Sequence, residues 1–246
     1  LSVNIISSDI PGKQLASVPR YQRTRENMMV LRDLLDGRAV DFHGEFVDLV
    51  LDPPNARTVS GQCPLFYFGG LSEPAREVAA ECADVFLMWP DTLPNVTSLL
   101  SDMRSRAAGF SRSLRFGYRV HVIVRETEAQ ARDAAFDLVS ELDDAEGAET
   151  RAKSLDSESV GVRAQGMLRE DSDGDGFVED NLWTGIGRAR SGCGAAIVGD
   201  PDQVLAKLKS YVALGIDAFI LSGYPHQGEC DLFAKYVLPE MDHAKL

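Results

Sequence analysis

The chain has 246 residues, of which 44% are hydrophobic and 26% are charged, as is usual for a folded globular protein. Its formal net charge of −13 argues against nucleic acid as a partner, because binding to a phosphate backbone requires a basic face. No apolar run approaches the roughly 20 residues of a membrane-spanning helix, so we expect no membrane contact either.

The hydrophobic pattern predicts strands that alternate with amphipathic helices along the chain. Strands are expected at Leu1–Ser7, Leu65–Phe68, Asp84–Trp89, Phe116–Val124 and Ala218–Ser222. Helices are expected at Arg20–Leu35, Glu73–Glu81, Pro94–Ala108, Glu128–Leu142 and Pro201–Leu214. Such alternation is typical of βαβ units and a parallel sheet, so we predict an α/β fold.

One segment, residues 143–194, interrupts this alternation. It is polar and irregularly helical, and it ends in four glycines interleaved with Arg188 and Arg190. A long excursion of this kind is typical of a mobile active-site lid, so we predict an insertion before the last strand. An exposed basic loop without a ligand is the alternative interpretation.

Cysteine and histidine spacing predicts no metal site. The four cysteines, Cys63, Cys82, Cys193 and Cys230, form no Cys-x-x-Cys pair, which favours a reducing cytoplasm over a disulfide framework or a structural zinc site. The acidic run at 171–176 resembles the start of a calcium loop but has Leu182 where the twelfth-position glutamate belongs. We interpret this run as an exposed acidic loop.

Arg119 and His121 are the most informative pair in the sequence. Both lie in the predicted strand Phe116–Val124, and strand alternation places them on the same face. Burying a guanidinium there is costly unless an anion lies opposite. The pair therefore predicts an anion-handling active site, and a structural ion pair with an acidic helix residue is the alternative.

Other strand ends carry residues that suit ligands. Gly69–Ser72 precedes a predicted helix, whose first amides, capped by Ser72, could bind a phosphate; an ordinary capped helix fits equally well. Trp89 and Tyr224 each stand at a strand end before a proline, which slightly favours a site-lining role over packing.

Four segments together resemble the alkanesulfonate monooxygenases, FMNH2-dependent enzymes of the bacterial-luciferase-like flavin monooxygenase family. The segments are Tyr67–Glu73, Arg119–Thr127, Asn181–Gly185 and Ser222–His226. The resemblance runs in order over essentially the whole chain. It implies a luciferase-like (β/α)8 TIM barrel, formed here by one partial domain, 1–246, in which the first three βα units are missing.

The resemblance also implies a reaction. A separate NAD(P)H-dependent FMN reductase would supply FMN as FMNH2, and O2 and the reduced flavin would convert an alkanesulfonate to an aldehyde and sulfite. A homo-oligomer is expected for the full-length protein. A related flavin-dependent monooxygenase acting on a sulfone or another small substrate, and a truncated non-catalytic relic, are the alternatives.

The family resemblance assigns roles to particular residues. The implied catalytic residues are Arg119, His121, Arg190, Tyr224 and Trp89. The implied flavin-binding residues are Asn4, Tyr21, Gly70 and Ser72, with Ser72 nearest the phosphate. Arginines suit a sulfonate or a flavin peroxide anion, and His121 suits proton transfer because free imidazole titrates near neutral pH.

Overall fold

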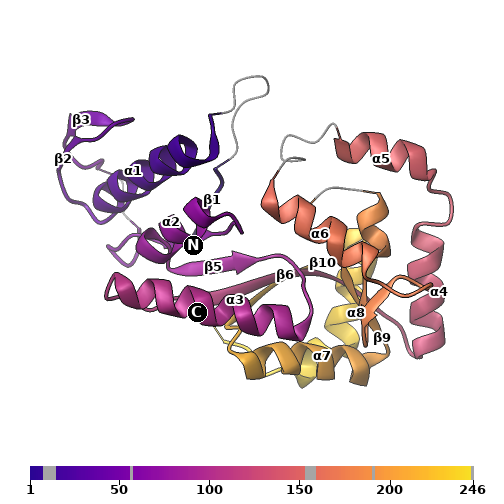
Figure 1. Cartoon of the computed structure of the whole chain (residues 1–246). Helices are drawn as coiled ribbons and strands as arrows, with labels where there is room; N and C mark the ends of the chain where they lie inside the picture. Colours follow the sequence, from indigo (N-terminus) through magenta and orange to yellow (C-terminus); the bar gives the residue numbers. More distant parts are fainter. Residues whose placement is uncertain (8–14, 56–57, 153–158, 190–191, 245–246) are drawn as a thin grey trace. The chain divides into compact units, whose positions relative to one another are not determined.

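The computed structural model describes residues 1–7, 15–55, 58–152, 159–189 and 192–244, and the chain divides into two units (Figure 1). Unit 1 comprises Leu1–Leu87 and Asp102–Arg115, and unit 2 comprises Met88–Ser101 and Phe116–Leu246. Helix α3 (Leu93–Gly109) begins in unit 2 and ends in unit 1.

Unit 1 is built on a parallel sheet in the order β1–β4–β5. Its strands are β1 (Ser2–Ile5), β4 (Leu65–Phe68) and β5 (Val85–Met88), close to their predicted positions. Phe66, Phe68 and Phe86 are at most 1% exposed and form the core of the unit. A separate antiparallel hairpin, β2 (Val40–His43) and β3 (Asp48–Leu51), was not predicted from the sequence.

Two helices of unit 1, α1 (Ser17–Leu35) and α2 (Glu73–Cys82), pack against each other (Figure 1). The buried side of α2 consists of small and apolar side chains, namely Ala75, Val78, Ala79, Ala80 and Cys82. Arg25 of α1 donates a hydrogen bond of 2.6 Å to Glu81 at the end of α2. This ion pair fixes the middle of α1 to the end of α2.

Glu26 of α1 is a buried carboxylate, 1% exposed, that organises the β2–β3 turn. It accepts backbone hydrogen bonds from Glu45 at 3.0 Å, Phe46 at 2.8 Å and Val47 at 2.9 Å. Burial alone would raise the pKa of Glu26, but these hydrogen bonds together hold the pKa below its ordinary value. The carboxylate is therefore ionised, and its oxygen atoms accept hydrogen bonds from groups of unit 1.

Unit 2 is built around the long strand β6 (Arg115–Val124). The strands β9 (Ala196–Gly199) and β10 (Ala218–Ser222) both pair with β6 in parallel. His121 lies opposite Ser222 of β10 and opposite Ala196 of β9. Two short strands, β7 (Phe177–Glu179) and β8 (Leu182–Trp183), extend the sheet from β9 with antiparallel pairing.

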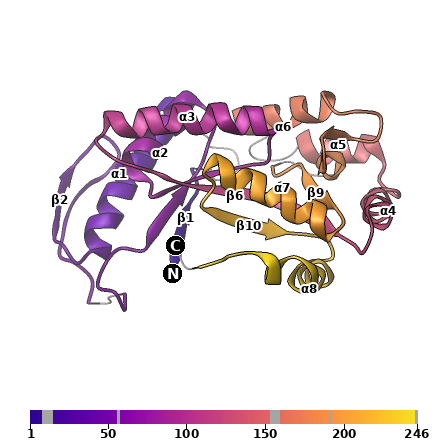
Figure 2. The ribbon, with the colours of Figure 1, turned by 90° about the horizontal axis from the view of Figure 1, so that it is seen from below.

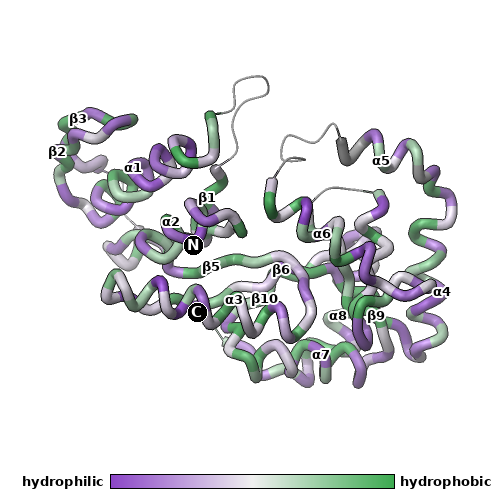
Figure 3. The backbone as a smooth tube through the Cα atoms, viewed as in Figure 1, coloured by the Kyte–Doolittle hydropathy of each residue, from purple (hydrophilic) through white to green (hydrophobic). Residues whose placement is uncertain are grey.

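The strand β9 was missed in the sequence prediction. All four of its residues are buried, so the strand shows no alternation, and Figure 3 shows it in hydrophobic colours. Because β9 follows residue 194, the segment 143–194 leads into β9 and not directly into the last strand, β10. That segment contains α5 (Asp144–Ala152), α6 (Val160–Glu170), β7, β8 and the 3-10 turn Gly185–Arg188.

The helices α4 (Glu128–Leu138), α7 (Pro201–Leu214) and α8 (His226–Tyr236) complete unit 2, with the 3-10 turn Leu238–Glu240 after α8. Figure 2 shows α7 running beside β6 and β10. Asp200 caps the start of α7, where Asp200 and Gln203 form a reciprocal capping box. None of the described helices is long and apolar enough to cross a membrane.

Side-chain packing distinguishes the two faces of β6. On one face Tyr118 stacks on Tyr211 of α7, with ring centroids 4.3 Å apart, and both side chains are fully buried. Strand alternation therefore directs Arg119 and His121 to the opposite face. The helix α7 thus covers the Tyr118 face of β6, and the candidate site residues Arg119 and His121 lie on the other face.

Replacing Glu26 with Gln should lower the free energy of unfolding by about 1–3 kcal/mol at neutral pH, because three backbone donors lose a buried, charged acceptor. Since the folded-state pKa is lowered, the carboxylate stabilises the protein above its unfolded pKa, and this stabilisation is lost as the pH falls through the folded-state pKa. The difference between the variants should therefore shrink in acid.

Urea unfolding of the Glu26→Gln variant at neutral and acidic pH measures both effects. Glu45→Gln is the matched control, because the Glu45 side chain is exposed and only its backbone N–H takes part. Equal stability of Glu26→Gln and the unmodified chain at neutral pH would contradict the assignment.

Candidate functional site

The structure separates the predicted site residues by unit. The predicted catalytic residues of unit 2 are Trp89, Arg119, His121 and Tyr224, and the predicted flavin-binding residues of unit 1 are Asn4, Tyr21, Gly70 and Ser72. Arg190 lies outside the described residues, so its predicted role in the loop stays a prediction.

His121 is 1% exposed and is held by residues from the end of β10. The Ser222 hydroxyl oxygen lies 2.8 Å from His121 Nδ1, a contact that the β6–β10 register makes possible. The ring of Tyr224 lies against the imidazole, with centroids 5.5 Å apart and planes tilted by 40°. The structure therefore brings together two of the predicted catalytic residues.

Arg119 lies two residues before His121 and is half-buried. Its partner across the sheet is Ile220 of β10, which is 40% exposed. Among the residues that the structure describes, the Arg119 guanidinium makes no hydrogen bond or ion pair, in contrast to Arg125, which pairs with the buried Glu229 at 2.7 Å. The alternative of a structural ion pair is therefore not observed within these residues.

The residues after β10 form a small aromatic group. The Tyr224 ring lies 4.7 Å from the ring of His226, which begins α8. His226 Nδ1 donates a hydrogen bond of 2.6 Å to the carbonyl of Gly223. Since a carbonyl can only accept, His226 carries a proton on Nδ1. The sequence analysis included His226 in a family segment but assigned it no role.

Trp89 follows β5 and meets the segment 143–194. A Cβ atom at Gly161 would lie 3.2 Å from the indole ring, and one at Gly192 would lie 3.5 Å away, so both glycines allow close packing. The buried amide of Gln165 donates to the Pro90 carbonyl at 2.7 Å and accepts from the Gly194 N–H at 3.0 Å. Gln165 thus joins α6 to the Trp89 loop, a role that local sequence did not reveal.

A buried polar network supports the residues just after Trp89. The Tyr211 hydroxyl donates to the Asp91 carbonyl at 2.9 Å, and Lys207 forms an ion pair of 2.7 Å with Glu179. Glu179 also accepts from the backbone N–H of Leu93. Burial raises the pKa of the Asp91 carboxyl. This network fixes the position of the chain between β5 and α3.

The start of α2 in unit 1 has the features of an anion site. Ser72 is the N-cap of α2, but its side chain makes no capping hydrogen bond. The buried polar atoms that lack a hydrogen-bond partner among the described residues include Ser17 Oγ and Arg20 Nε of α1 and Ser72 Oγ. Buried polar groups are normally paired, and a helix N-terminus attracts negative charge. These residues therefore fit the phosphate of a flavin mononucleotide.

A contact of Tyr21 places α1 beside this helix start. The Tyr21 hydroxyl lies 3.4 Å from the position of a Cβ atom at Gly70, and such a Cβ would come within 2.7 Å of Ala75, so glycine is needed there. The Arg20 guanidinium carbon lies 5.1 Å from the Tyr21 ring centroid. Arg20 was not predicted as a site residue, although it directly precedes Tyr21. Asn4 lies on β1 and is exposed.

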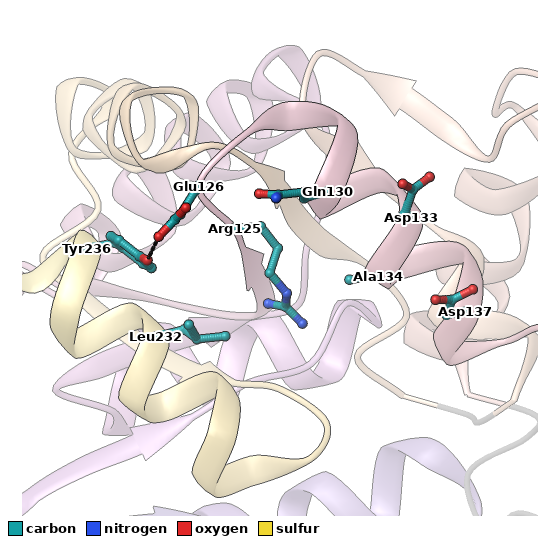
Figure 4. Close-up of a pocket in the computed structure, with 8 residues that line it drawn as sticks. All are labelled: Arg125, Glu126, Gln130, Asp133, Ala134, Asp137, Leu232 and Tyr236. Atoms are coloured by element: carbon teal, nitrogen blue, oxygen red, sulfur yellow. Dashed lines mark hydrogen bonds between the residues drawn. The ribbon is translucent and has the colours of Figure 1, made fainter.

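A pocket of about 450 Å³ opens at the carboxyl end of β6, between α4 and α8 (Figure 4). It is lined by Arg125, Glu126, Gln130, Asp133, Ala134, Asp137, Leu232 and Tyr236. The Tyr236 hydroxyl donates to Glu126 at 2.7 Å. None of the predicted site residues lines this pocket, so it is separate from the Arg119–His121 face.

Metal-ligating and nucleophilic groups are sparse. No cluster of three or more histidine, cysteine or carboxylate side chains able to bind a metal occurs in the described ranges. The four cysteines are free, and burial raises the pKa of the Cys82 thiol to about 11, which keeps it protonated at neutral pH. Asp173 uses its carboxylate to accept from the backbone of Asp175 and Phe177.

Two characterised relatives match the chain over its whole length. A sulfoquinovose monooxygenase from Novosphingobium aromaticivorans is 63% identical over 246 residues, and one from Agrobacterium fabrum is 46% identical over 249 residues. The chain spans 68% and 64% of the lengths of these relatives. Their names specify sulfoquinovose, whereas the sequence resemblance had suggested alkanesulfonates.

The comparison of structures confirms the predicted luciferase-like α/β fold. A riboflavin lyase, solved with modified FMN and riboflavin, matches with a TM-score of 0.73 at 14% identity, over 93% of this chain and 58% of that one. The sequence profile described as luciferase-like monooxygenase matches residues 18–218. With its fold and most of its sequence matched in this way, the chain belongs to the luciferase-like monooxygenase family.

Proposed function

We propose that this chain is the part of a flavin- and O2-dependent monooxygenase that acts on the sulfonated sugar sulfoquinovose and releases sulfite. The observation that carries the proposal is the placement of Arg119 and His121 on one face of β6, in a chain 63% identical to a sulfoquinovose monooxygenase. A guanidinium that has no partner among the described residues, on the same strand face as a buried imidazole, suits a sulfonate that must lose its carbon–sulfur bond.

The reaction class follows from the chemistry of the substrate. Insertion of one oxygen atom at the carbon that bears the sulfonate breaks the carbon–sulfur bond and gives an aldehyde and sulfite, while the second oxygen atom leaves as water. The reduced flavin, when bound, supplies the two electrons that this reaction requires.

The residues of unit 2 take three roles in this proposal. Arg119 binds the sulfonate through charge-assisted hydrogen bonds, which are stronger than neutral ones in a half-buried position. His121, buried and hydrogen-bonded at Nδ1, transfers the proton that is released or taken up at the substrate. Trp89 and Tyr224 exclude water around them, and Arg190 remains a predicted second cation.

The residues of unit 1 bind the flavin in this proposal. Ser72 and the first amides of α2 receive the phosphate, and Arg20 offsets its charge. Tyr21 and Gly70 shape the same loop, and Asn4 on β1 contacts the flavin ring. A separate NAD(P)H-dependent reductase that supplies reduced FMN, and a homo-oligomeric state, complete the proposal.

The chain, given reduced FMN and O2, should release sulfite from sulfoquinovose faster than from an unbranched alkanesulfonate. Arg119→Ala should lower kcat/KM by about 30- to 150-fold, because a charged hydrogen bond to the anion contributes about 2–3 kcal/mol. Sulfite trapped by a disulfide reagent is the readout.

Arg115→Ala is the matched control, since Arg115 is an exposed arginine at the start of the same strand. Faster turnover of the alkanesulfonate would favour the substrate class first indicated by the sequence. If neither substrate releases sulfite, the proposed activity is contradicted. If kcat/KM is unchanged in the Arg119→Ala variant, Arg119 does not bind the sulfonate.

Ser72→Ala should weaken the binding of FMN but not that of riboflavin, which lacks the phosphate. Loss of one hydrogen bond to a charged group predicts a rise of about 10- to 100-fold in the dissociation constant of FMN. Titration followed by flavin fluorescence measures both ligands with the same protein. Equal weakening of both flavins, or of neither, would contradict the phosphate assignment.

A further inference from the structure

Ser222, at the last position of β10, is hydrogen-bonded to the imidazole of His121. In the parallel register, Ser222 lies directly opposite His121, so their side chains share a face of the sheet. Ser222 Oγ lies 2.8 Å from His121 Nδ1, although 101 residues separate the two in sequence. Because the imidazole is 1% exposed, bulk water does not compete for this ring nitrogen.

The hydrogen-bond partner of His121 is a hydroxyl group, whereas that of the nearby His226 is a backbone carbonyl. The carbonyl of Gly223 only accepts, so it keeps a proton on His226 Nδ1. A carboxylate would likewise favour a protonated ring nitrogen. A serine hydroxyl both donates and accepts, so it forms a hydrogen bond to Nδ1 whether or not that nitrogen carries a proton.

Arg119, Tyr224 and Ala196 also lie around His121. Arg119 shares the strand face with His121. Tyr224 packs on the ring face at 5.5 Å between centroids, and Ala196 of β9 lies opposite in the register. Ring packing restrains the plane of the imidazole, whereas the hydrogen bond selects which nitrogen faces β10.

We infer that Ser222 is a positioning residue for His121: its hydroxyl donates to Nδ1 of the neutral ring, which places the ring proton on Nε2, and accepts from Nδ1 when His121 is protonated. Ser222 thereby lets His121 gain and lose a proton without changing its orientation. The catalytic consequence rests on the proposed function, but the state of the His121 ring does not.

The first measurement reads the His121 ring directly. In the full chain with 15N-labelled histidine, long-range proton–nitrogen spectra report which ring nitrogen carries the proton. The chain has four histidines, and Asn substitution of His121 identifies its signals by their loss. Neutral His121 should show a bare Nδ1 and a protonated Nε2. Ser222→Ala should change this pattern, and Ser222→Thr, which keeps the hydroxyl, should preserve it.

The second measurement determines kcat and KM for sulfite release. Ser222→Ala should lower kcat for sulfite release by roughly tenfold or more while changing KM by less, because misplacing a proton-transfer group acts on the chemical step. Ser222→Thr should restore kcat. Ser140→Ala is the matched control, since Ser140 is an exposed serine that bonds only its own helix end.

The two measurements separate the possible failures. Identical His121 spectra in Ser222→Ala and the unmodified chain would overturn the inference, as would unchanged kcat in an active enzyme. A ring that responds to Ser222→Ala in a chain that releases no sulfite would support the positioning contact and overturn the proposed function instead. If Ser222→Ala fails to fold, a Ser222→Thr spectrum that differs from that of the unmodified chain overturns the inference.

Discussion

The parallel register between β6 and β10 is the constraint on which the chemistry of unit 2 depends. It sets Ser222 opposite His121 and Ile220 opposite Arg119, so the strand pair presents a hydroxyl to the imidazole and an apolar neighbour to the guanidinium. A slip of one residue would send Ser222 to the face that packs on α7. The Tyr118–Tyr211 stack on that face makes such a slip costly, because it fills the space with fully buried rings.

The helix α1 shows within one element how a satisfied and an unsatisfied polar group differ. Glu26 is buried but accepts three backbone hydrogen bonds, so its charge is accounted for within the fold. Two turns earlier, Arg20 buries a guanidinium nitrogen that has no partner in the described part of the chain, and Ser72 does the same with its hydroxyl. Because buried polar groups are normally paired, Arg20 of α1 and Ser72 at the start of α2 are the positions at which we propose that the flavin phosphate binds.

Gly161, Gln165 and Gly192 contact Trp89 and its loop through packing and one side-chain amide. Gly161 and Gly192 leave room for the Trp89 ring, and Gln165 bonds both the Trp89 loop and the end of the segment. Each of these residues has an unremarkable local sequence. Their role arises from a glutamine whose two partners, Pro90 and Gly194, are far apart along the chain.

The sequence by itself determined the alternation of strands and helices and the shared face of Arg119 and His121, because both depend on spacing within a few residues. Only the tertiary structure revealed β9, whose four buried residues show no period, and the partners Ser222 and Gln165. It also identified Arg20, through a buried guanidinium nitrogen that has no hydrogen-bond partner in the part of the chain that the structure describes. The physical reason is that burial and hydrogen-bond partners depend on residues distant in sequence, such as the 101 positions between His121 and Ser222.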